Sequence, residues 1–179
     1  MKPALSERTT RAVEVPAARR DVLVFRVGDQ RYAVALRDVA EIVPMARLAT
    51  SPSLPAVVDG FLNLAGRAVA VVRLARLLGT TEQPPGLHTP LLVLRHAEPP
   101  VALLVQQVER IVRLADSAVL PVAPDDSFNA AVAGVTTLDG QSVFLLAPDL
   151  LLLAKEQQCL AEFQDREQSR LRALAGAHP

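Results

Sequence analysis

The chain has 179 residues, of which 19 are Lys or Arg and 19 are Asp or Glu, so its formal net charge is zero. A neutral chain with only 3% aromatic residues lacks the basic surface and stacking rings of a nucleic-acid-binding protein, and a small β-barrel nucleic-acid module is kept only as an alternative. The longest apolar runs fall far short of the about 20 residues of a membrane helix, so we expect no direct membrane insertion.

The N-terminal part of the chain predicts no ordered element. Residues 1–20 carry several arginines with little apolar periodicity, which predicts a flexible leader. No signal-peptide pattern opens the chain, and the single cysteine, Cys159, has no partner for an internal disulfide. These features predict a cytoplasmic protein, which a partner can hold beside a membrane.

A β-hairpin is predicted next, because residues 22–27 and 31–36 are rich in β-branched and aromatic side chains and flank a Gly-Asp turn. Residues 38–43 predict a short helical turn or bend. The prolines within 50–55 donate no hydrogen bond, so this stretch is expected to be an irregular connection.

A second hairpin is predicted over 57–64 and 67–74, where apolar side chains fall on both faces, so both faces should be covered. A helical turn then ends at Gly79, a glycine suited to a helix C-terminus. Residues 79–90 are rich in Pro, Gly and Thr and predict the linker between two subdomains.

The second unit follows the same plan. A hairpin is predicted over 91–95 and 101–106, and a strand over 108–114. An Asp-Gly turn between 132–138 and 142–146 predicts the last hairpin.

The two units are related by an internal repeat. The segment from Leu23 reappears at Leu92, a shift of 69 (92 − 23), and the segment from Gly60 reappears at Gly134, a shift of 74 (134 − 60). Two copies of roughly seventy residues are too few and too long for a solenoid. The repeat therefore predicts two small, similar, packed subdomains.

Residues 154–175 predict an amphipathic C-terminal helix with an apolar stripe at helical spacing. The stripe consists of Leu152, Cys159, Leu160, Phe163, Leu171 and Leu174. Two interpretations stay open: the helix packs on the barrels along its first half and frays afterwards, or its stripe binds another protein.

Residues with chemical reactivity are few and scattered. His88, His96 and His178 lack the spacing of metal ligands, and no glycine-rich loop leads into a helix. A small hydrolase using Asp125 or Asp126 with a histidine is a further alternative, but no positioned pair supports it. The sequence predicts no enzyme activity, no metal and no cofactor.

Four segments follow one another in a characteristic order and spacing: Val24-Phe25-Arg26-Val27-Gly28-Asp29, Tyr32-Ala33-Val34, Val39-Ala40-Glu41-Ile42 and Gly60-Phe61-Leu62-Asn63-Leu64-Ala65-Gly66. In this order and spacing they resemble the CheW family of chemosensory coupling proteins. The resemblance covers about residues 21–153. It implies an all-β fold of two packed five-stranded SH3-like β-barrel subdomains with short connecting helices, to which the predicted C-terminal α-helix is added.

The resemblance also implies a function. Members of the family are adaptors without catalytic activity, so the chain is expected to couple a chemoreceptor to a CheA-type histidine kinase. The implied partners are the kinase's regulatory domain and the receptor's cytoplasmic hairpin tip, with an apolar groove between the subdomains accepting the receptor. The family's partner-facing positions fall on Val39, Glu41 and Gly60. A structural interpretation stays open, with Val39 as core, Gly60 as a backbone requirement and Glu41 as a solvated charge.

The chain departs from the family's pattern at three positions: Ala65 replaces the Arg of an Asn-Leu-Arg-Gly motif, Ala70 replaces a Pro, and Arg73 replaces an Asp. Because the missing arginine would pair with Glu41, we predict that Arg67, on the same face of its strand, has taken over this pairing. The predicted partner-binding set is Val39, Glu41, Gly60, Asn63 and Arg67. The departures favour an accessory or specialised coupling protein.

Overall fold

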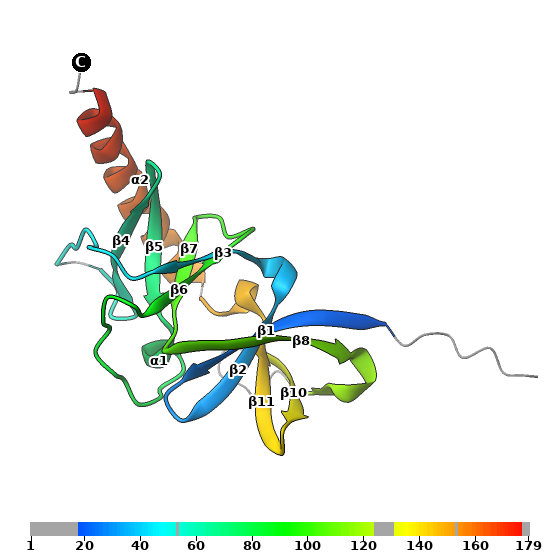
Figure 1. The fold of residues 1–179 in the computed structure, drawn as a ribbon. Helices are drawn as coiled ribbons and strands as arrows, with labels where there is room; N and C mark the ends of the chain where they lie inside the picture. The colour runs from blue at the N-terminus through cyan, green and yellow to red at the C-terminus, as the bar shows by residue number, and fades with distance from the viewer. Residues whose placement is uncertain (1–17, 53, 124–130, 153, 177–179) are drawn as a thin grey trace, which may run out of the picture.

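The computed structural model describes residues 18–176 except 53, 124–130 and 153. Most of the predicted leader, the Asp125 and Asp126 pair, and His178 therefore lie outside the described residues. The described chain forms two β-sheets that pack together, and a long helix ends it (Figure 1). The predicted all-β fold of two packed subdomains with a C-terminal helix is confirmed.

The first sheet has six strands in the order β8-β1-β2-β11-β10-β9 and so combines the two ends of the domain. Its strands are β1 (Arg19–Val27), β2 (Gln30–Ala35), β8 (Gln107–Ala115), β9 (Leu120–Pro121), β10 (Val132–Leu138) and β11 (Gln141–Leu146). Neighbouring strands are antiparallel except β2 and β11, which run parallel.

The second sheet has five strands in the order β3-β6-β7-β5-β4, with β5 and β7 parallel. Its strands are β3 (Val39–Pro44), β4 (Val58–Leu64), β5 (Arg67–Arg73), β6 (Pro90–Leu94) and β7 (Val101–Leu104). The helical elements are the α-helices α1 (Leu74–Leu77) and α2 (Ala154–Gly176) and the 3-10 turns η1 (Leu36–Asp38), η2 (Asp116–Ala118) and η5 (Pro148–Leu150). In the part of the chain that the structure describes, no helix has the length and apolar character needed to cross a membrane.

The predicted hairpins are confirmed as β1–β2, β4–β5, β6–β7 and β10–β11. The turns of β1–β2, β4–β5 and β10–β11 contain residues with a positive φ, and the sequence supplies a glycine in each. Gly28 has a φ of 59° and Gly140 a φ of 74°. Local turn chemistry therefore favours these three pairings.

The helical turn predicted over 38–43 is wrong for most of its length. The 3-10 turn η1 ends at Asp38, and β3 follows as a strand paired with β6. Valine and isoleucine at 39, 42 and 43 favour a strand, but a β-bulge between Val39 and Glu41 breaks the alternation by which strands are recognised. The consecutive β3 residues 40–42 are all exposed as a result.

The two copies of the repeat do not each form one subdomain, which corrects the sequence interpretation. Strands β3, β4 and β5 of the first copy share a sheet with β6 and β7 of the second, whereas β1 and β2 join β8–β11. The predicted linker over 79–90 therefore connects two strands of one sheet rather than two subdomains. The copies remain structurally equivalent, because Gly60 in β4 and Gly134 in β10 each follow a β-bulge.

Three apolar clusters hold the sheets together: one in each sheet and one shared by both. Strand β5 contributes Val69 and Val71 to the cluster of its own sheet, and Ala70 and Val72 to the shared cluster. Both faces of the hairpin are covered, as predicted. Helix α2 joins the shared cluster through Leu160, which is fully buried.

Candidate functional site

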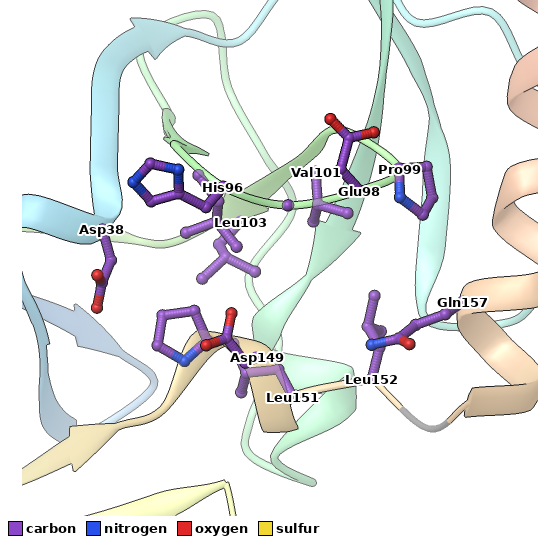
Figure 2. A pocket seen from close by; sticks show the side chains of 13 residues that line it. Asp38, His96, Glu98, Pro99, Val101, Leu103, Asp149, Leu151, Leu152 and Gln157 are labelled. Carbon is purple, nitrogen blue, oxygen red and sulfur yellow. The ribbon is translucent and has the colours of Figure 1, made fainter.

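A cleft opens between the β6–β7 hairpin and the segment that leads from β11 into α2 (Figure 2). We call it the seam cleft, and its volume is about 240 Å³. Its apolar part includes Leu94, Val101, Leu103, Leu151 and Leu152, and its polar rim consists of Asp38, His96, Glu98, Asp149 and Gln157. A concave apolar floor inside a polar rim is typical of a binding site.

The rim of the seam cleft is mainly acidic. Asp38, Glu98 and Asp149 contribute three carboxylates against the one imidazole of His96. Among the described residues, no group of His, Cys, Asp and Glu side chains is arranged to hold a metal ion. Carboxylates around an apolar floor favour a protein partner with apolar and basic side chains over a small anion.

Two of the five predicted site residues support the fold. Val39 is 6% exposed and belongs to the shared core. Gly60 has a φ of 151°, and a Cβ at this position would lie 2.6 Å from the carbonyl oxygen of Ala49. Only glycine allows this approach, in which Ala49 and Phe61 exchange two backbone hydrogen bonds of 2.8 Å. Both residues have the environments that the structural interpretation describes.

The other three predicted residues, Glu41, Asn63 and Arg67, are exposed. Asn63 accepts a hydrogen bond from the backbone N–H of Gly66 at 2.9 Å and thereby stabilises the β4–β5 turn. None of the five predicted residues lines the seam cleft. The cleft instead uses Asp38, the neighbour of Val39 in the chain.

The predicted ion pair between Glu41 and Arg67 is absent from the part of the chain that the structure describes, so this prediction is wrong. Across the second sheet, Glu41 lies opposite Val93, and the register continues through Ala102 to Val71. Arg67 is three strands from Glu41 and four residues before Val71. Strand alternation predicts the face on which Arg67 lies, but it carries no information about the strand order.

The β4–β5 turn contains backbone strain at Ala65, where the chain departs from the CheW pattern. Ala65 has a φ of 50°, a left-handed conformation that costs a residue with a Cβ about 1–2 kcal/mol. Glycine avoids this cost but loses about 0.5–1 kcal/mol through its freer unfolded state. We expect Ala65→Gly to raise the free energy of unfolding by about 0.5–1 kcal/mol in urea denaturation. The same change at Ala133, which has no positive φ, should lower the free energy of unfolding. If both substitutions lower the free energy of unfolding, Ala65 is not strained.

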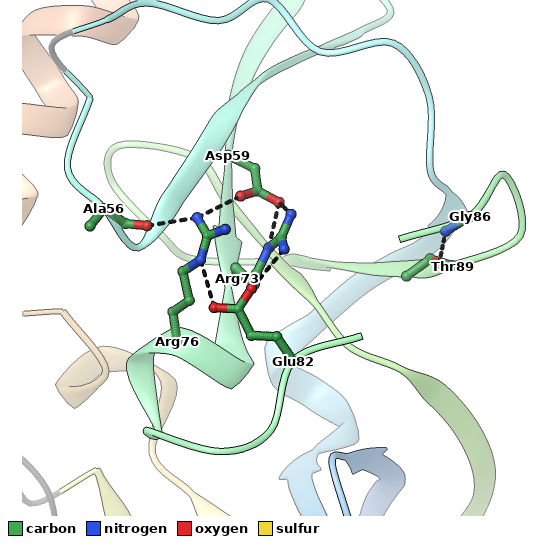
Figure 3. Close-up of polar contacts among 7 residues, drawn as sticks. All are labelled: Ala56, Asp59, Arg73, Arg76, Glu82, Gly86 and Thr89. Atoms are coloured by element: carbon green, nitrogen blue, oxygen red, sulfur yellow. Dashed lines mark hydrogen bonds and ion pairs between the residues drawn. The ribbon is translucent and has the colours of Figure 1, made fainter. Parts of the chain in front are cut away.

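Arg73, the last of the three departures, has internal partners (Figure 3). Its guanidinium donates to Asp59 at 2.5 and 2.8 Å and to Glu82 at 2.9 Å. Arg76 donates to Glu82 at 2.7 Å and to Asp59 at 3.2 Å. The network fastens the start of the 79–90 segment to the β4–β5 hairpin.

The network shifts the pKa of two of its members. Hydrogen bonds from Arg76 and then Arg73 lower the pKa of the Glu82 carboxyl below its ordinary value, against the opposing effect of burial. Burial acts to lower the pKa of Arg73, but hydrogen bonds to Asp59 and Glu82 outweigh it, so the net shift is upward. Both shifts favour the charged forms that make the network. Sequence reasoning found the charge change at Arg73 but missed its partner Asp59, fourteen residues earlier.

Two glutamines one helical turn apart fasten α2 to β5. Gln168 donates to the carbonyl oxygen of Gly66 at 2.7 Å and accepts from the N–H of Ala68 at 2.9 Å. Gln164 donates to the carbonyl oxygen of Ala68. Because β7 pairs with β5 only from Ala70 onward, the two amides occupy the edge of β5 that no strand covers. This contact was missed because glutamine does not belong to an apolar stripe.

Comparison with known proteins gives a consistent result. The CheW-like domain family matches residues 21–156. The chain is similar to chemotaxis protein CheW of Rhizobium meliloti, with 29% identity over 142 residues covering 78% of this chain and 91% of that protein. It is also similar to chemotaxis protein CheW of Thermotoga maritima, with 24% identity over 132 residues covering 74% and 87%.

Among solved structures, the scaffolding protein TtCheW from Thermoanaerobacter tengcongensis has the same fold. The TM-score is 0.70 at 18% identity, and the match covers 78% of this chain and 96% of that chain. The matched family region ends at residue 156, so all but the first three residues of α2 lie beyond it.

The fold and the sequence matches define the class of protein as a two-subdomain, all-β scaffold. The chain belongs to the family of CheW-like domains. Proteins of this family are non-enzymatic adaptors of chemosensory signalling. The prediction of an adaptor without enzyme activity is thereby confirmed.

Proposed function

We propose that this chain couples a chemoreceptor to a CheA-type histidine kinase and that its seam cleft binds the cytoplasmic hairpin tip of the receptor. The observation that carries the proposal is the apolar floor of the cleft, which lies between the β6–β7 hairpin of one sheet and the segment leaving the other. The adaptor would then work in the cytoplasm, beside receptor arrays, without a cofactor.

The size of the cleft suits a weak, repeated contact. A few aliphatic side chains at about 25 cal/mol per Å² of buried apolar area, less the cost of association, give micromolar binding more readily than nanomolar. An array of receptors and adaptors multiplies such contacts and gains its stability through avidity.

For the kinase, the proposal uses the outer strands β3 and β8. Ile42 on β3 is 46% exposed and Ile111 on β8 is 56% exposed. They are equivalent in the repeat, because 111 − 42 is the shift of 69. Both subdomains thus present an isoleucine on a strand at the end of the sheet order, which suits barrel-to-barrel contact with the kinase's regulatory domain. Glu41 lies beside Ile42 and belongs to this surface.

Two features support the proposal of a specialised variant. The departures at Ala65 and Arg73 change the β4–β5 hairpin, and α2 lies over the edge of β5 beside the same turn. Binding of another protein to α2 is proposed only around its end, at Leu174, which is 60% exposed. Asn63 and Arg67 would contribute to partner binding from this turn.

Calorimetric titration of the chain with a receptor hairpin fragment and with a CheA-type regulatory domain tests the proposal. Ala97 lines the seam cleft, so Ala97→Trp should fill it and weaken receptor binding by about 10-fold or more, leaving kinase-domain binding unchanged. Ile42→Lys and Ile111→Lys should weaken kinase-domain binding and leave receptor binding unchanged.

The matched control is Ala173→Trp, which adds the same side chain to an exposed position of α2 and should affect neither titration. Full receptor binding by Ala97→Trp would remove the seam cleft from the proposal. A wild-type chain that binds neither partner would refute the adaptor role.

A further inference from the structure

Four of the eight residues that line a second pocket are arginines. We call it the arginine pocket, and its volume is about 570 Å³. Its charged residues are Arg19, Arg20, Asp21, Arg37, Arg95 and Asp116. The four arginines come from the start of β1, from η1 and from the residue after β6. In a chain without net charge, this is a strong local concentration of positive charge.

The carboxylates of the pocket do not neutralise it. Asp116 pairs with Arg20, with 2.6 Å between Oδ1 and Nε. Asp21 pairs at 2.8 Å with Arg113, which does not line the pocket. Among the described residues, the other three arginines therefore have no carboxylate of the pocket as a partner.

Arg95 is held in place by neutral groups. Its Nε donates to the carbonyl oxygen of Arg37 at 3.0 Å, and its Nη2 donates to that of Val39 at 2.9 Å. The guanidinium is thus oriented while its charge stays uncompensated. The Arg37 side chain is 87% exposed and reaches a carboxylate, Asp38, only at 3.6 Å. The Arg19 side chain makes no hydrogen bond or ion pair within the described part of the chain.

The arginine pocket and the seam cleft use alternate residues of the same two segments. Arg37 lines the pocket, and the next residue, Asp38, lines the cleft. Arg95 lines the pocket, and its neighbours Leu94 and His96 line the cleft. The two sites therefore share the same two supporting segments.

We infer that the arginine pocket binds an acidic segment of a protein partner. The guanidinium fork matches a carboxylate in geometry and charge, and an arginine already oriented loses little freedom on binding. A volume of about 570 Å³ holds several side chains rather than one small anion. No aromatic side chain lines the pocket to stack on a nucleic-acid base. That the partner is the protein in the seam cleft rests on the proposed function.

A fluorescein-labelled hexaglutamate peptide, titrated against the full chain at low and high salt, tests the inference. The double variant Arg19→Glu, Arg37→Glu changes two exposed side chains that make few contacts, so the fold should be kept. It should weaken peptide binding by about 10-fold or more. The control double variant Arg47→Glu, Arg172→Glu makes the same change of net charge at exposed arginines outside the pocket and should change binding by less than about 2-fold.

Arginine side-chain Nε–Hε NMR signals locate the peptide. Shifts confined to Arg19, Arg20, Arg37 and Arg95 are expected. The inference would be overturned if both double variants weakened peptide binding equally or if chemical-shift changes spread over the whole surface. Displacement of the peptide by equimolar inorganic phosphate would also overturn it. The Ala97→Trp variant should still bind hexaglutamate. A wild-type chain that binds hexaglutamate but not the receptor fragment would refute the proposed function and leave this inference standing.

Discussion

Replacing Asp59 by alanine is expected to lower the free energy of unfolding by about 3 kcal/mol. The Asp59 and Arg73 side chains are only 9% and 13% exposed, so the variant leaves a guanidinium in a largely buried position without its main partner. Removing one partner of a buried pair costs about 3–5 kcal/mol, and the remaining contact with Glu82 places the loss at the lower end. Urea denaturation measures it.

The exposed pair of Asp21 and Arg113 provides the control. These side chains are 39% and 68% exposed, and Asp21→Ala should lower the free energy of unfolding far less than Asp59→Ala does, because solvent screens an exposed pair. The double variant Asp59→Ala, Arg73→Met should recover most of the lost free energy of unfolding, because it also removes the guanidinium that Asp59→Ala leaves unpaired. A loss at Asp59 no larger than that at Asp21 would show that the network adds no stability.

The hairpins were predictable because a short turn brings together strands that are neighbours in the sequence. The parallel pairs β2–β11 and β5–β7 have no such local signal, since each joins strands from different copies of the repeat. The repeat offsets of 69 and 74 residues show that the two copies are similar. They do not show which strands pair. For this reason the subdomains were predicted correctly in number and wrongly in composition.

The candidate site shows the same limit. The seam cleft joins residues near 38, 94–103 and 148–157, which only the folded chain brings together. The family resemblance located Val39, one residue from the cleft, but spacing alone could not distinguish a buried Val39 from an exposed Glu41. The bulge in β3 decides that difference, and no residue in β3 signals a bulge as glycine signals a turn.

The second large effect is expected at Leu160, where alanine should lower the free energy of unfolding by about 3 kcal/mol. Leu160 is fully buried in the core that both sheets share, and α2 supplies it from outside the sheets. Phe163 packs against the same cluster, while Gln164 and Gln168 bind the edge of β5. The first half of α2 is therefore part of the domain, although most of the helix lies beyond the matched family region.

Leu174 belongs to the same predicted stripe and is the natural comparison, because it is 60% exposed. Leu174→Ala should change the free energy of unfolding by less than about 0.5 kcal/mol. A loss below about 1 kcal/mol at Leu160 would mean that the helix detaches readily and that its stripe is free for a partner. If Leu160 behaves as expected, removing the whole helix would destabilise the domain and obscure any effect on binding. Leu174→Asp then tests partner docking on α2 without disturbing the core.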